Sequence, residues 1–140
     1  MSEELDPERA IEALTAEARR AAPAGQEGAL RAALANAMVA MKKEYYGRGP
    51  TAAKAWLLDD YVFVVLEGGL TRNEETLLAA GREDVVRAYR LAFQEAVRDV
   101  TTGAVAELTG RKVLTYHSQI VFDPPRAFEI FVLEPAEDAA

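Results

Sequence analysis

Apolar side chains recur at helical spacing in two long stretches of the chain. The first stretch lies between residues 28 and 46, with apolar positions three or four residues apart: Leu30, Leu34, Met38, Met41 and Tyr45. This spacing predicts a helix with one apolar face, and it places Lys42 and Lys43 on the outward side. Gly47 ends this helix, and Gly49 and Pro50 form the following turn.

The second stretch, residues 85–108, is preceded by a shorter predicted helix. Thr71 and Glu74 have the spacing of a capping box, which predicts a short helix that runs to Ala80 and is ended by Gly81. Apolar residues then advance again in helical steps: Val85, Tyr89, Phe93, Val97, Val100, Ala104 and Leu108. The weak helix formers at 101–103 predict a bend in this second long helix, which Gly110 ends.

Four β-prone runs predict strands at residues 51–58, 61–66, 112–122 and 127–133. Asp59 and Asp60 separate the first two runs at hairpin length, although Asp-Asp is a poorer two-residue turn than Asp-Gly and a longer loop stays open. Residues 123–126 contain two prolines, which cannot donate to a strand ladder, so the second turn lies there. The order of elements predicts an α+β fold, a four-stranded antiparallel sheet of two hairpins with helices on one face.

The first 27 residues differ from the rest in charge, because they carry seven acidic and only three basic side chains. Asp6 and Pro7 are typical of a helix start, and the Pro and Gly at 23–25 break the segment. Two interpretations stay open: a short amphipathic helix on a linker, separate from the core, or a frayed acidic extension. The predicted organisation is an N-terminal helix and linker at 1–27, a domain at 28–135 and an acidic tail at 136–140.

Composition narrows the possible function classes. The chain has 140 residues, the size of one domain, and a net charge of −7, which argues against a surface for nucleic acid or anionic lipid. It contains no cysteine, which excludes disulfides, thiol chemistry and zinc–thiolate sites. His117 is the single histidine, so a site with two imidazoles is also excluded. We expect no cofactor and a cytoplasmic location, because no apolar run is long enough for a bilayer and the acidic start lacks the order of a signal peptide.

Six short motifs occur in register along the predicted domain: YGRGPT at 46–51, LEGGLT at 66–71, LAAGRED at 78–84, FQ at 93–94, ELTGRK at 107–112 and FVLEP at 131–135. With these motifs the chain resembles the MpsC family of YbcI-like proteins, formerly DUF2294, over residues 28–135. The family name implies a link to a sodium-translocating system that generates membrane potential. The resemblance implies no catalytic residues. In the last hairpin the chain departs from the family, whose expected His-x-Asp-Pro-Asp is here Val121-Phe122-Asp123-Pro124-Pro125.

Two polar sites are weighed here on residue chemistry. His117 suits a general base or a metal ligand, but a structural or solvated strand histidine is the stronger interpretation, since no second histidine exists. Its cross-strand neighbour, such as Glu129 or Glu134, depends on the hairpin register, which a two-, three- or four-residue loop would set differently. Asp59 and Asp60 suit a hard cation, yet adjacent acids in a hairpin tip are common turn formers.

The glycine loops are weaker candidates for anion binding. Gly68, Gly69 and Thr71 precede a helix N-terminus, where backbone amides favour anions, so they form a weak anion-site candidate. The loop around Arg48 follows a helix, so an anion there would face the negative end of the helix dipole. Arg48 is instead a candidate contact to a partner.

The strands are apolar on both alternating sets of positions, which raises the question of an interface. Trp56 lies on one face and Ala55 on the other, and the last strand carries Phe131 and Leu133 on the alternate face to Phe128. A sheet with helices on one side should be polar outside, so a second subunit or the N-terminal helix is expected to cover the second face. Trp56, Phe131 and Leu133 are therefore interface candidates.

These observations favour a non-enzymatic accessory or regulatory protein that acts through protein contacts, and the family resemblance implies that it serves a sodium-coupled membrane system. The expected partners are a second copy in a homodimer and a membrane protein complex contacted from the cytoplasm, with no insertion into the bilayer. A small-molecule or ion-sensing module, with its ligand between sheet and helices or at Gly68 and Gly69, is the alternative.

Overall fold

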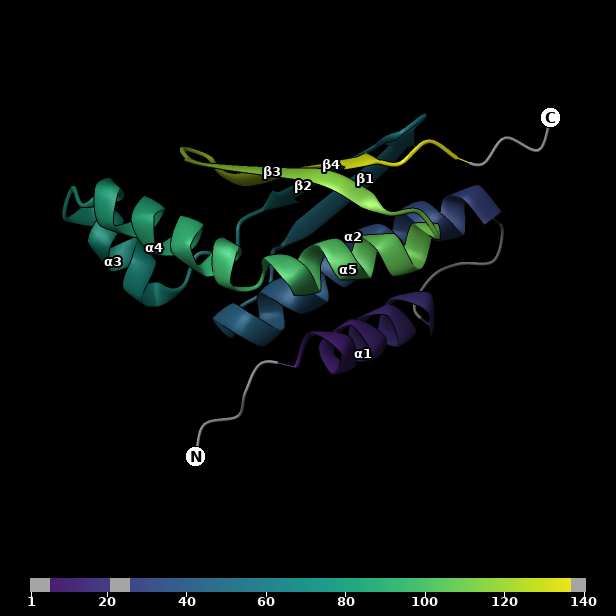
Figure 1. The fold of residues 1–140 in the computed structure, drawn as a ribbon. Coiled ribbons are helices and arrows are strands. Elements are labelled where there is room, and N and C mark those ends of the chain that lie inside the picture. Colours follow the sequence, from purple (N-terminus) through teal and green to yellow (C-terminus); the bar gives the residue numbers. More distant parts are fainter. Residues whose placement is uncertain (1–5, 21–25, 137–140) are drawn as a thin grey trace.

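The computed structural model describes residues 6–20 and 26–136 (Figure 1). Its elements in chain order are α1 (Pro7–Arg20), α2 (Gln26–Tyr46), β1 (Ala52–Leu58), β2 (Tyr61–Glu67), α3 (Arg72–Ala79), α4 (Glu83–Ala96), α5 (Arg98–Thr109), β3 (Val113–Phe122) and β4 (Pro125–Leu133). The predicted α+β class and the order of helices and strands are confirmed. No helix in the described ranges is long and apolar enough to cross a membrane.

The strands form one antiparallel sheet in the order β1-β2-β4-β3. Both hairpins have two-residue turns, since Leu58 pairs with Tyr61 and Phe122 pairs with Pro125. Asp59 adopts a positive φ of 52°, which an aspartate tolerates better than most residues and which lets the Asp-Asp turn close. The two-residue second turn places Tyr116 opposite Phe131, so these two side chains share a face.

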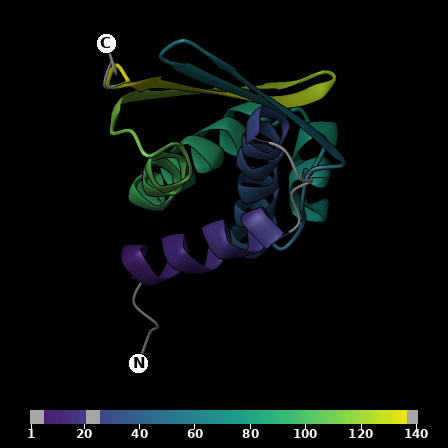
Figure 2. The ribbon, with the colours of Figure 1, turned by 90° about the vertical axis from the view of Figure 1, so that its right-hand side faces the viewer.

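The molecule has three layers (Figures 1 and 2). The sheet is uppermost in both views, α2 and α5 lie beneath it, and α1 lies beneath these two helices, on the side away from the sheet. The opposite face of the sheet has no helix over it in the described residues. The N-terminal helix is thus confirmed, but it is not separate from the core and it does not cover the second sheet face.

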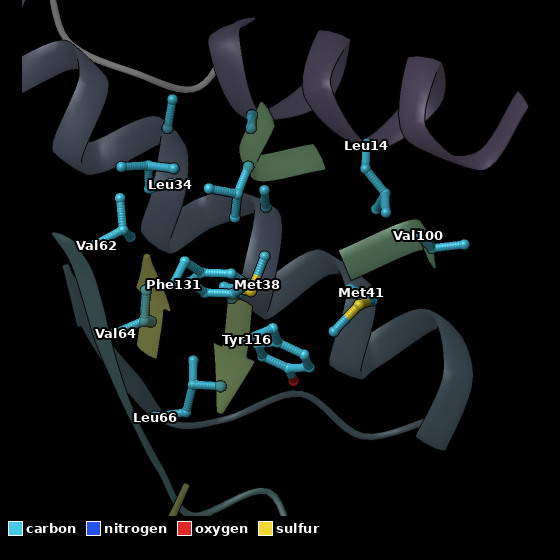
Figure 3. Packing of buried hydrophobic residues seen from close by; sticks show 14 of the residues in the cluster. Leu14, Leu34, Met38, Met41, Val62, Val64, Leu66, Val100, Tyr116 and Phe131 are labelled. Carbon is cyan, nitrogen blue, oxygen red and sulfur yellow. The ribbon is translucent and has the colours of Figure 1, made fainter. Parts of the chain in front are cut away.

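The core lies between the sheet and the helices (Figure 3). Phe131 is fully buried and stacks on Tyr116, with ring centroids 4.8 Å apart. Met38 and Leu34 of α2 meet these strands, and Leu14 and Ala18 of α1 extend the same cluster below the helices. Burying such side chains stabilises the fold by about 1.5–3 kcal/mol each, so α1 contributes to the stability of the domain.

The second long helix breaks at Val97, four residues before the predicted bend at 101–103. Thr101 and Thr102 lie inside α5, and their hydroxyls donate to the carbonyls of Val97 and Arg98, at 3.1 and 3.0 Å. Gly103 has a packing role, since a Cβ there would lie 2.2 Å from Cδ1 of Ile11. The absence of a side chain at Gly103 therefore lets α1 approach α5 closely.

Candidate functional site

One face of the sheet has none of the described helices over it, and this face is apolar at its centre. We call it the outer sheet face, and alternation along the paired strands places these apolar residues on it: Trp56, Leu58, Tyr61, Phe63, Val65, Phe128, Ile130 and Val132. Leu58, Tyr61 and Ile130 are 65%, 53% and 36% exposed. A contiguous exposed apolar patch of this kind is characteristic of an interaction surface.

Aromatic rings run across the outer sheet face from one strand to the next. Trp56 on β1 packs against Phe63 on β2 at 5.6 Å between ring centroids, and Phe63 stacks with Phe128 on β4 at 6.4 Å. Cross-strand aromatic pairs hold each other in place on a pleated surface. The aromatic surface is therefore continuous from β1 across β2 to β4.

Charged groups are confined to the margins of the outer sheet face. Lys54 lies on the edge strand β1, while Glu67 and Arg126 are paired residues at one end of β2 and β4. Glu67 and Arg126 form no ion pair within 4.0 Å among the described residues. His117 is on this face, exposed, opposite Ile130, and its Nε2 lies 3.2 Å from Oγ1 of Thr115. Neither Glu129 nor Glu134 is its cross-strand partner.

The inner face of the sheet holds a buried carboxylate. Glu129 is 0% exposed and accepts hydrogen bonds from the hydroxyls of Tyr116 and of Ser118, the latter at 2.9 Å. Nζ of Lys42, on α2, lies 3.9 Å from Oε2 of Glu129. Lys42 is only 3% exposed, so its predicted outward position is wrong. It follows Met38 by four residues and therefore shares the buried face of α2.

A second buried ion pair joins α3 to α4. Nε and Nη2 of Arg90 both lie 2.5 Å from the carboxylate oxygens of Glu74, and the side chains are 5% and 4% exposed. Arg90 also donates to the Gly69 carbonyl at 3.1 Å and lies 3.9 Å from the ring centre of Tyr46. These contacts fix the short helix α3 and the glycine loop onto the helical layer.

Burial and hydrogen bonding shift the pKa values of these groups. Burial lowers the pKa of Lys42, and the Glu129 carboxylate opposes that shift. Burial raises the pKa of Tyr116, with a further rise from Glu129, and burial also raises the pKa of Tyr46. Burial alone would raise the pKa of Glu74, but hydrogen bonds from Arg90 and Thr71 bring it below its ordinary value. The ionised form of Glu74 is therefore stabilised by Arg90 and Thr71, whereas burial favours the neutral forms of Lys42 and Tyr116.

A small cleft of about 230 Å³ opens beside this network, between α4, the start of α5 and β3. Its polar lining includes Gln94, Arg98 and Ser118. Nε2 of Gln94 is buried without a hydrogen-bond partner among the described residues. Arg98 lies over the Tyr116 ring at 5.2 Å and pairs loosely with Glu95 at 3.9 Å. Gln94 lines the cleft, so a small polar molecule bound there would lie beside its unpartnered amide.

The anion-site candidate is already filled by the chain itself. Thr71 caps α3, its hydroxyl accepts from the Glu74 amide at 3.2 Å, and the Glu74 carboxylate accepts from the Thr71 amide at 2.8 Å. The predicted capping box is confirmed. Gly68 and Gly69 have φ values of 70° and 87° and lie against Thr51 and Pro50, so they serve a tight chain crossing.

The interface candidates separate into two groups. Trp56 lies on the outer sheet face as expected. Phe131 and Leu133 are 0% and 1% exposed and point into the core, so their prediction as surface contacts is wrong. Arg48 is exposed but donates to the Leu70 carbonyl at 3.1 Å and lies 3.9 Å from Glu75.

The acidic candidates in the first hairpin turn, Asp59 and Asp60, make structural contacts with Arg111. Asp60 pairs with Nη2 of Arg111 at 2.5 Å, and Arg111 also donates to the Asp59 carbonyl at 3.0 Å. The Asp-Asp turn is thereby tied to the segment before β3. Across residues 6–20 and 26–136, no group of three or more potential ligands is placed to hold a metal ion.

Two comparisons with known proteins bear on this arrangement. Residues 26–135 match the family described as "Na+-translocating membrane potential-generating system (MpsC)". The chain is also similar to "Uncharacterized protein YbcI" of Bacillus subtilis (strain 168), with 25% identity over 97 residues, in a match that covers 67% of this chain and 77% of that protein. The family match over residues 26–135 covers all four strands and every helix of the described residues except α1.

Proposed function

This chain belongs to the MpsC family, and we propose that it is a non-enzymatic accessory or regulatory protein of a sodium-coupled, membrane-potential-generating system. It acts through protein contacts made by the outer sheet face. The observation that carries the proposal is the uncovered centre of that face, which is apolar and aromatic across all three strands β1, β2 and β4.

The energetics of the outer sheet face support a partner. Each apolar Å² removed from water contributes about 25 cal/mol before the costs of association. Leu58 and Tyr61 are more than half exposed, so a partner that covers them gains from each. Since α1 packs beneath the other helices, it does not compete for this surface.

The buried polar groups support a structural rather than a chemical role. Glu129 is inaccessible and bonded to Tyr116 and Ser118, and Glu74 is bound to Arg90. A catalytic acid or base has to reach a substrate proton, which these enclosed pairs do not favour. The proposed partners are a second copy of the chain and a membrane complex met from the cytoplasmic side.

The test is complementation of a strain that lacks this protein, with the sodium-dependent membrane potential as readout. Ile130→Glu places a charge in the centre of the outer sheet face and should abolish complementation. Leu91→Glu is the matched control, because Leu91 on α4 is similarly exposed, at 44% against 36%, but lies on the helical side of the sheet and not on the outer sheet face. Full activity of Ile130→Glu at normal protein level would refute the proposal.

A small-molecule sensor is the second proposal, and the unpartnered Gln94 amide beside the cleft favours it. A ligand that accepts from this amide and contacts Arg98 would raise the melting temperature in a saturable way. A thermal-shift screen of sodium, phosphate, nucleotides and small carboxylates tests this, with Gln94→Leu as the variant that should lose the effect. Absence of any saturable shift would remove this proposal.

A further inference from the structure

We propose that the outer sheet face pairs with the same face of a second copy, through a two-fold axis that runs parallel to the strands between β2 and β4. This inference rests on the proposed use of that face for protein contacts and names its occupant. Sheets that pack face to face keep their strands roughly aligned, so such an axis matches the usual geometry of a sandwich.

Charge complementarity selects this axis. The sheet order β1-β2-β4-β3 places the axis at its centre, so β2 of one copy faces β4 of the other at the same level along the strands. Glu67 and Arg126 are paired at one level. Glu67 of each copy therefore faces Arg126 of the other, which gives two intermolecular ion pairs.

The apolar residues at the centre of the outer sheet face also meet apolar residues of the second copy under this two-fold rotation. Phe63 is level with Ile130, and Val65 is level with Phe128, so each meets the other across the interface. Lys54 of β1 and Gln119 of β3 also lie at one level along the strands. Lys54 of one copy therefore faces Gln119 of the other copy, and no like charges meet. An axis perpendicular to the strands would instead move Glu67 and Arg126 over the apolar level of Tyr61 and leave both charges unpaired.

The size of the face predicts a weak dimer. Four strands at about 4.8 Å spacing and seven residues at about 3.3 Å rise give a flat footprint of roughly 440 Å² per copy. Two copies then bury on the order of 900 Å² of flat area, and the projecting side chains add to this area. The total is at the low end for specific interfaces. We expect dissociation in the micromolar range, which leaves the face able to exchange its second copy for another partner.

Sedimentation velocity of the full chain across the micromolar range tests the inference. The wild-type chain should convert from monomer to dimer as concentration rises, Ile130→Glu should weaken the dimer by more than tenfold, and Leu91→Glu should leave it unchanged. Leu58→Glu, at a 65% exposed position, replaces Ile130→Glu if that variant does not fold.

Charge reversal tests the axis. Glu67→Arg and Arg126→Glu should each weaken the dimer, and the double variant should restore it. A wild-type chain that stays monomeric, a dimer indifferent to both outer-face variants, or single reversals without effect would each overturn the inference. Failure of complementation by Ile130→Glu with a monomeric wild-type chain would overturn the dimer while leaving the proposed function in place.

Discussion

Replacement of Glu74 by glutamine is the sharpest test of the buried charge arrangement. Glu74→Gln keeps the shape of the side chain and an oxygen that can accept from the Thr71 amide, but it removes the charge that neutralises Arg90. The Arg90 side chain is only 5% exposed, so its guanidinium would remain buried without an anion. Breaking a buried pair in this way costs about 3–5 kcal/mol.

A surface pair on the next helix supplies the matched control. Arg87 and Glu83 lie 2.7 Å apart, but their side chains are 38% and 59% exposed. Glu83→Gln should therefore cost no more than about 0.5 kcal/mol. The comparison separates the effect of burial from that of pairing, because both variants make the same chemical change within a helix.

Urea unfolding at neutral pH measures both variants, and acid titration gives a second readout. Because the folded pKa of Glu74 is lowered, its contribution is present above pH 4.5 and is lost as pH falls through the folded value. The difference between wild type and Glu74→Gln should shrink accordingly in acid. The double variant Glu74→Gln/Arg90→Met should recover part of the loss. A cost below about 1 kcal/mol for Glu74→Gln would refute this account of the pair.

Two further predictions concern the tyrosine network and the approach of α1. Because burial raises the pKa of Tyr116 while the unfolded residue ionises near pH 10.0, unfolding free energy should fall above that pH. Tyr116→Phe should reduce the slope of unfolding free energy against pH by about 1.4 kcal/mol per pH unit, as measured by urea titrations above pH 10.0. An unchanged slope would contradict the raised pKa of Tyr116 in the folded state. Gly28→Ala, with open space around it, should stabilise α2 by up to about 1 kcal/mol, whereas Gly103→Ala should show no such gain because it displaces Ile11. Equal thermal stabilisation by both variants would show that α1 does not pack closely on α5.

Local sequence patterns were sufficient for the order of helices and strands, although they missed the break between α4 and α5 at Val97. The Thr71–Glu74 spacing predicted a capping box whose two hydrogen bonds are present. The prolines after Asp123 correctly located the second turn. These signals depend on neighbours in the chain, so they do not require knowledge of the tertiary structure.

The orientation of the last strand could not be predicted in the same way. Its two faces are both apolar, so alternation did not show whether Phe131 or Ile130 points to the core. The two-residue turn sets the register and places Phe131 on the same face as Tyr116, and the packing of the helices on that face buries both. The buried charges were missed for a related reason, since Lys42 meets Glu129 and Arg90 meets Glu74 only once separate elements pack together.

Oxidative footprinting in living cells tests the central claim, that the outer sheet face is covered by protein. Tyr61 on this face and Tyr89 on α4 are 53% and 46% exposed in the single chain, so they should react at similar rates if both are free. Hydroxyl radicals generated in cells that express the protein label both, and mass spectrometry gives their rates. The account predicts that Tyr61 is oxidised several-fold more slowly than Tyr89, and equal rates would contradict it.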